Sequence, residues 1–171
     1  MRFAALCDEF QDVFQAPGLA PHRPLDHAID LVDENTTPPR HKQYRLSANE
    51  LEVVQQHVDD MLAKGWIRPS ISLYGAPILF VCKKTGELRM CVDFCSLNKQ
   101  MHLDMFPIPH IHNLLNKFGK ARIFSAVDLS SAYHQVCIKE GHKHKTAFLT
   151  LMSLFEYVVM PLSLTNAPAT L

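Results

Sequence analysis

Asp128 is the residue whose type and setting point most directly to chemistry. It follows the apolar run 124–127, so the sequence predicts a strand over residues 123–129 with this carboxylate near its end. A carboxylate at a strand end can project into a cleft and bind Mg²⁺, a hard ion that prefers oxygen ligands. The same aspartate can instead cap a helix that starts at Leu129, and taken alone it favours that alternative.

Two cations, Lys84 and Arg89, fall in a predicted β-hairpin upstream of this carboxylate. Apolar runs of strand length at 77–82 and 88–92 flank a Lys-Thr-Gly-Glu turn, which is typical of two paired strands. A pair of cations on such a hairpin can grip a phosphate. Without further information, two solvated side chains are the simpler interpretation.

Two helices are predicted around the hairpin. Ser47 and Glu50 form a capping box, apolar residues follow at helical spacing, and Gly65 can end that helix. A second, short amphipathic helix is expected after Pro109 and should end at Gly119. Further strands are predicted at 27–31, 135–138, 146–151 and 155–160.

Composition indicates a globular protein without a strong charge preference. Hydrophobic residues make up 47% of the 171 residues, which suits a packed core, and the formal net charge is zero. Residues 71–171 have ten lysines and arginines against six acids, which is compatible with phosphate contacts and also with ordinary surface variation.

The cysteines and the N-terminus bear on compartment. The five cysteines contain no C-x-x-C pair, so neither a disulfide framework nor a zinc site is indicated, and the paired histidines at 110/112 and 142/144 are interpreted as solvated. The apolar run at residues 3–7 is too short for a signal peptide, and no stretch approaches a membrane span. An intracellular protein, cytoplasmic or nuclear, is expected.

Several segments, in order, resemble gypsy-type reverse transcriptases of LTR retrotransposons. Residues 124–136 read Phe-Ser-Ala-Val-Asp-Leu-Ser-Ser-Ala-Tyr-His-Gln-Val and are similar to the first catalytic motif of that family. Leu-Asn-Lys at 97–99, Lys-Thr-Ala-Phe at 145–148 and Leu-Thr-Asn-Ala-Pro-Ala-Thr at 164–170 match other family segments. The resemblance extends over about residues 8–171.

The resemblance implies an α+β fold, the fingers and incomplete palm of a right-hand polymerase. The many prolines of residues 17–46 indicate an extended N-terminal arm, assigned to 1–46. The resemblance implies a fingers-like region at 47–120 and a partial palm at 121–171. The implied activity is RNA-directed DNA polymerase, in which two metal ions, Mg²⁺ or Mn²⁺, act on the attacking and leaving oxygens. The implied partners are an RNA template, a DNA primer and deoxynucleoside triphosphates, with no membrane.

The resemblance also implies roles for individual residues. Asp128 would be the first metal-binding carboxylate and the catalytic residue, with the Leu129 carbonyl as a neighbouring ligand in the nucleotide pocket. Tyr133 would lie under the incoming sugar, and Gln135 would line the same pocket. The roles of the two hairpin cations follow in the same way: Lys84 and Arg89 would bind the triphosphate.

This sequence departs from the family pattern in places. It contains no Tyr-x-Asp-Asp, the motif that supplies two further carboxylates, so these residues are expected to end before the site is complete. Cys95 stands where the family usually has arginine, and Ser163 stands where a glycine permits close approach. Two alternatives therefore stay open: an inert remnant, and a catalytically inactive chain that binds nucleic acid through basic residues, namely Lys83, Lys84, Arg89, Lys117, Lys120 and Arg122.

Overall fold

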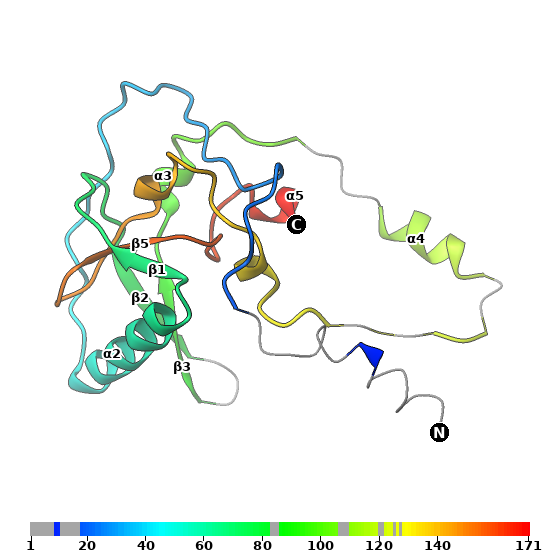
Figure 1. Ribbon diagram of the computed structural model, residues 1–171, viewed down its shortest axis with the longest axis horizontal. Helices are drawn as coiled ribbons and strands as arrows, with labels where there is room; N and C mark the ends of the chain where they lie inside the picture. Colours follow the sequence, from blue (N-terminus) through cyan, green and yellow to red (C-terminus); the bar gives the residue numbers. More distant parts are fainter. Residues whose placement is uncertain are drawn as a thin grey trace.

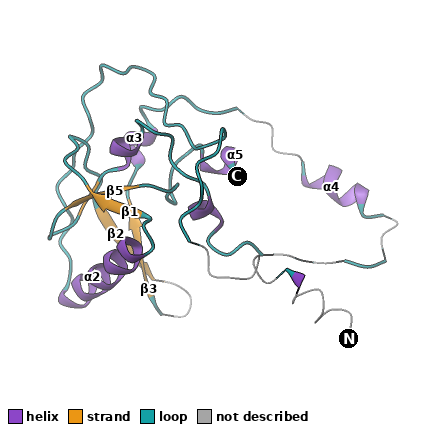
Figure 2. Cartoon of the chain, in the orientation of Figure 1, coloured by secondary structure: helices purple, strands orange, loops and turns teal. Residues whose placement is uncertain are grey.

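The fold is α+β, and the described part of the chain contains two small antiparallel sheets and one long helix. The computed structural model describes residues 9–10, 18–82, 86–105, 110–119, 122–124, 126 and 128–171. One sheet has three strands in the order β1 (Ile67–Pro69), β5 (Leu154–Tyr157), β4 (Phe148–Leu149), and the other pairs β2 (Ile78–Cys82) with β3 (Leu88–Val92). Figure 1 and Figure 2 show both sheets on the same side of the molecule, beside helix α2 (Ala48–Ala63).

Helix α2 begins and ends where its sequence predicts. The Ser47 hydroxyl accepts the Glu50 N–H, and the Glu50 carboxylate accepts the Ser47 N–H at 2.7 Å, which completes the capping box. The helix ends before Gly65, whose φ of 70° lies in the left-handed region that glycine adopts without strain. Its buried side chains, including Val58 and Met61, pack toward β1 and β3.

The predicted hairpin is confirmed over its paired strands. Ile78 lies opposite Val92, Phe80 opposite Met90 and Cys82 opposite Leu88, so the register is regular along both strands. Ile78 is fully buried, whereas Arg89 on β3 is exposed. Residues 83–85 of the turn lie outside the described part of the chain.

The three-stranded sheet is shorter than predicted. Residues 143–146 form a 3-10 turn, η3 (Lys143–Thr146), because the Thr146 hydroxyl donates to the Lys143 carbonyl at 2.7 Å, so β4 starts only at Phe148. The strand predicted at 155–160 is β5, which ends at Tyr157. Clustered rings fill the core here, with the centroids of Phe148 and Tyr157 5.1 Å apart.

Two other predicted strands are reduced to single bridges. His27 bridges Ile138, and Leu31 bridges Met101, but 27–31 forms no continuous ladder. The segment predicted as a strand at 135–138 begins instead inside a 3-10 turn, η2 (Ala132–Gln135), and only Cys137 and Ile138 make bridges.

The strand predicted at 123–129 is wrong for its described residues, none of which lies in a strand. Ile123, Phe124 and Leu129 are each at least 66% exposed, so no neighbouring strand covers this apolar segment. A strand requires a paired edge, and none of the described strands pairs with these residues.

The short amphipathic helix is confirmed as α4 (Ile111–Lys117), although its apolar side chains are not buried. Figure 1 shows α4 apart from the two sheets, and Leu115 is 56% exposed. The ring of Phe118, at the C-terminal end of α4, lies 5.8 Å from that of Phe124 in the segment that follows. Two further helices are single turns, α3 (Cys95–Asn98) and α5 (Ala167–Thr170). Within the described residues, no helix is both long and apolar enough to cross a membrane.

Candidate active site

Asp128 lies in an exposed segment between α4 and η2. Its side chain and that of Leu129 face solvent, and no described residue forms a hydrogen bond or ion pair with the carboxylate. The alternative in which it caps a helix beginning at Leu129 is wrong, because the next helical turn starts at Ala132 with Ser131 at its N-cap.

Tyr133 and Gln135 lie together on η2, just downstream. Ser131 opens this turn with φ of 50°, and its carbonyl accepts the His134 N–H at 2.8 Å. Both predicted pocket residues are half-buried, and Tyr133 packs against the hydrophobic core. The turn is thus a fixed element rather than a free loop. It would hold the two side chains in place.

A feature that the sequence did not reveal anchors this turn. The ring of His134 stacks on the indole of Trp66, which precedes β1. Burial, the largest cause, and the nearby charges of His57, Lys64 and Arg89 together lower the pKa of His134 to about 4. His134 is therefore neutral at physiological pH. The sequence of residues 133–135 gave no indication of this contact, because Trp66 lies far away in the chain.

Arg89 approaches the same turn from the hairpin. It is exposed on β3, and its positive charge acts on the imidazole of His134. Lys84, its expected partner, lies outside the described residues. Among the described residues, no hydrogen bond or ion pair joins Asp128 to Arg89, Tyr133 or Gln135.

Among the other basic residues proposed for nucleic acid, Arg122 is exposed. Lys83 and Lys120 lie outside the described residues, and the side chain of Lys117 is not described.

Side-chain hydrogen bonds connect two of the segments that resemble the family. The amide of Asn98 donates to the Ser163 carbonyl at 2.8 Å and accepts the Thr165 N–H at 3.1 Å. The amide of Asn166 similarly donates to the His102 carbonyl at 2.8 Å. Ser163 adopts φ of 78°, the left-handed conformation that glycine tolerates best, at the position where the family that this sequence resembles has a glycine.

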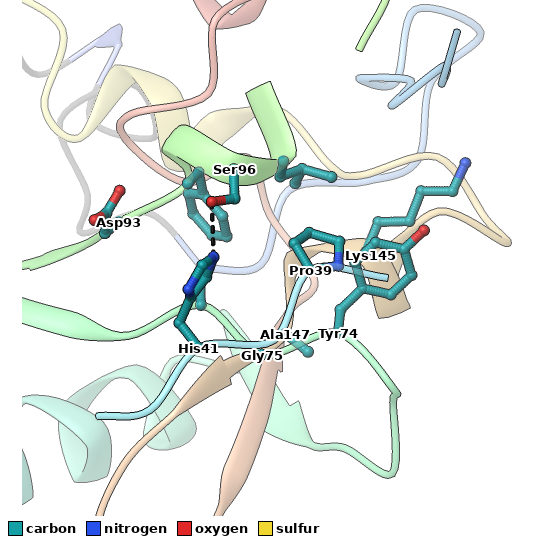
Figure 3. Close-up of a pocket in the computed structure, with 11 residues that line it drawn as sticks. Pro39, His41, Tyr74, Gly75, Asp93, Ser96, Lys145 and Ala147 are labelled. Carbon is teal, nitrogen blue, oxygen red and sulfur yellow. Dashed lines mark hydrogen bonds between the residues drawn. The ribbon is translucent and has the colours of Figure 1, made fainter. Parts of the chain in front are cut away.

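Three cavities in the described structure have walls that do not include Asp128. The one in Figure 3 has a volume of about 10 Å³, which is room for roughly one water molecule. Its wall includes His41 and Ser96, which share a hydrogen bond of 2.7 Å drawn as a dashed line in Figure 3. This cavity is too small for a nucleotide. Two larger open hollows, of about 670 and 890 Å³, are lined by other residues.

Comparisons with solved structures place the fold. A crystal structure of the prototype foamy virus protease-reverse transcriptase, a CSH mutant, aligns with 98% of this chain at a TM-score of 0.81 and 22% identity, and the match takes in 23% of the viral chain. The foamy viral enzyme in complex with an RNA/DNA hybrid aligns at a TM-score of 0.76 with the same identity and coverage. At this identity the likeness establishes a reverse transcriptase fold.

Similar sequences identify the family to which the chain belongs. The Transposon Tf2-3 polyprotein of Schizosaccharomyces pombe is 37% identical over 149 residues, which is 87% of this chain. The chain spans only about 11% of the length of that polyprotein. Residues 81–171, more than half of the sequence, match the family described as reverse transcriptase (RNA-dependent DNA polymerase). This chain therefore belongs to the reverse transcriptase family.

Proposed function

We propose that this chain supplies the fingers and part of the palm of a gypsy-type reverse transcriptase. In this proposal residues 1–46 are an N-terminal arm, residues 47–120 the fingers-like region and residues 121–171 a partial palm. The relationship to a transposon polyprotein supports the gypsy-type assignment. The helix-and-hairpin unit before residue 100, followed by the exposed Asp128 segment, supports the division.

Asp128 is proposed as the catalytic carboxylate, holding Mg²⁺ or Mn²⁺ together with the Leu129 carbonyl. The fit rests on the donor: an exposed oxygen ligand with no described partner suits a hard divalent ion. When bound, such an ion neutralises charge that develops on the reacting phosphate oxygens. One carboxylate provides only part of the ligand set that two metal ions need.

The remaining roles belong to residues around η2 and the hairpin. Arg89, with Lys84, would bind the triphosphate of an incoming deoxynucleoside triphosphate through charge-assisted hydrogen bonds. Tyr133 would support the sugar with its ring, and Gln135 would contact the same nucleotide. Support comes from the position of Tyr133 and Gln135 on one turn, and from the effect of the Arg89 charge on the pKa of His134 between them.

An RNA template and a DNA primer are the proposed macromolecular partners. A structural neighbour was solved with an RNA/DNA hybrid, and another with double-stranded DNA. Exposed Arg89 and Arg122 provide cations that can contact phosphates.

The family match across residues 81–171, which contains Asp128 and Tyr133, is the observation that carries this proposal. The test is a chimera in which these 171 residues replace the aligned segment of the Tf2-3 polyprotein reverse transcriptase. We expect the chimera to extend a DNA primer on an RNA template when Mg²⁺ or Mn²⁺ is supplied. A folded chimera that binds the hybrid without extending it would contradict the enzymatic proposal and favour a catalytically inactive nucleic-acid-binding chain.

A further inference from the structure

Three side chains with metal-binding atoms meet on the face of the molecule that holds the N-terminal arm. One ligand atom from each of His22, Asp26 and Cys137 lies within 4.8 Å of the other two. His22 and Asp26 belong to a short turn, and Cys137 belongs to the segment that follows η2. The large sequence separation explains why cysteine spacing gave no indication of this cluster.

The backbone builds this arrangement. The Arg23 N–H donates to the Asp26 carboxylate at 3.0 Å, which fixes the turn. The His27 N–H donates to the Cys137 carbonyl at 2.8 Å, and Cys137 also bridges Val159. The arm is therefore held against the Cys137 segment by main-chain contacts that do not depend on an ion.

We propose that His22, Asp26 and Cys137 form a binding site for a zinc-class divalent ion. Thiolate, imidazole and carboxylate are the three ligand types that Zn²⁺ takes in proteins, and three protein ligands leave one position for water or another ligand. A sulfur ligand discriminates against Mg²⁺, which prefers oxygen. The site is thus chemically distinct from the one proposed at Asp128.

The charges of the ligands match a divalent ion. Burial raises the pKa of the Cys137 thiol, so a bound ion must displace its proton. The resulting thiolate and the Asp26 carboxylate together balance two positive charges, and His22 binds as a neutral ring. Lys143 lies near this cluster, but its ammonium group forms an ion pair with Glu140 at 2.6 Å, which offsets its repulsion. Arg23 is the other nearby cation.

Small side-chain movements complete the geometry. His22 Nδ1 and the Asp26 carboxylate share a hydrogen bond of 2.5 Å, and this bond must open because ligand atoms around tetrahedral zinc lie roughly 3.4 Å apart. The side chain of His22 is 54% exposed and can shift, whereas Cys137 is buried. Both His22 and Asp26 line the open hollow of about 890 Å³, from which an ion can enter.

Ion binding would tie the N-terminal arm to the segment that follows Tyr133 and Gln135. The added link would be independent of catalysis, because none of the three ligands belongs to the proposed active site. We therefore expect it to stabilise the fold rather than to take part in nucleotidyl transfer.

The test is a titration of the 171-residue chain with Co²⁺, followed by displacement with Zn²⁺. A cobalt–thiolate band in the near-ultraviolet should rise to one equivalent and disappear when Zn²⁺ is added. Cys137→Ser should abolish the band, and His22→Ala should weaken Co²⁺ binding by about tenfold or more. Cys82→Ser, which removes an exposed cysteine elsewhere, should leave both unchanged.

His22→Ala changes an exposed residue, so it keeps the test valid if Cys137→Ser does not fold. A band that survives Cys137→Ser, an unchanged affinity in a folded His22→Ala, or no thiolate band in the unsubstituted chain would each overturn the proposal.

Discussion

The imidazole of His134 stacks on the indole of Trp66, with ring centroids 4.2 Å apart and planes inclined by 30°. Trp66 is itself fixed, because its carbonyl accepts the Val158 N–H at 2.8 Å next to β5. His134 lies between Tyr133 and Gln135, so this one contact attaches the proposed nucleotide-binding turn to the three-stranded sheet.

Removing the stack should loosen that attachment. We expect His134→Ala to lower the free energy of unfolding by about 1 kcal/mol, the usual worth of an aromatic pair beyond its burial. Trp66 is the single tryptophan, so its emission should also shift to longer wavelength as the indole gains water. His134→Phe, which keeps a ring on the indole, should shift the emission less. Urea unfolding followed by tryptophan fluorescence measures both effects, and an unchanged spectrum in His134→Ala would contradict the stacked arrangement.

Acid should destabilise the fold through His27. This side chain is 1% exposed, its Nδ1 shares a hydrogen bond of 2.7 Å with the Thr170 hydroxyl, and burial lowers its pKa to about 4. The unfolded chain, in which a histidine has its ordinary pKa near 6.5, therefore binds more protons between pH 6.5 and 4. Stability should be complete above pH 6.5 and fall as the pH drops through this window, by at most about 1.4 kcal/mol per unit for each such histidine.

The same window applies to His134, whose pKa is also lowered to about 4. Urea unfolding at pH 7 and pH 5 tests the effect, with His27→Gln compared against His102→Gln at an exposed position. The His27 substitution should reduce the difference between the two pH values, and the His102 substitution should not. An equal pH dependence in both variants would show that burial of His27 does not set the acid sensitivity.

Local signals in the sequence predicted the local elements. The Ser47–Glu50 capping box and Gly65 delimit α2, and the two apolar runs around the turn pair as β2 and β3, because caps and tight turns depend on adjacent residues. The strand predicted at 123–129 is wrong because strand formation depends on a distant partner that the apolar pattern does not encode.

Contacts between distant segments were the part of the structure that the sequence did not predict. Three contacts join residues far apart in the chain: the ring stack of His134 on Trp66, the hydrogen bond from Asn98 to Ser163, and the proximity of Cys137 to His22. The resemblance covers both segments joined by Asn98, residues 97–99 and 164–170, but it does not indicate that they touch. The roles proposed for Asp128, Lys84, Arg89, Leu129, Tyr133 and Gln135 stay predictions.

Ser163 should be a position where substitution stabilises the fold. Its φ of 78° costs a residue with a Cβ about 1 kcal/mol, and glycine avoids this cost at some loss of unfolded-state constraint. We expect Ser163→Gly to raise the free energy of unfolding by about 0.5 kcal/mol or more, while Ser163→Ala, which keeps the Cβ, does not. Thermal or urea unfolding decides the matter, and a destabilised Ser163→Gly would mean that the hydroxyl matters more than the backbone conformation.

These 171 residues alone are expected not to extend a primer. They contain no Tyr-x-Asp-Asp, and a single carboxylate at Asp128 cannot hold two metal ions. The measurement is primer extension on an RNA template with Mg²⁺ or Mn²⁺, compared with the Asp128→Ala variant of the same chain. Extension above that control would show that other carboxylates of this chain complete the site.

The most direct test of the central claim, that Asp128 is the metal-binding carboxylate, is the rate of primer extension by the chimera with Asp128→Asn. Catalysis of this class depends on charge stabilisation, and losing one oriented group in other enzymes costs roughly 10²–10³ in rate. We predict a fall of at least that size with unchanged affinity for the RNA/DNA hybrid, whereas Glu52→Gln, at an exposed carboxylate of α2, keeps the full rate. A chimera whose Asp128→Asn variant extends the primer as fast as its Glu52→Gln variant would contradict the assignment.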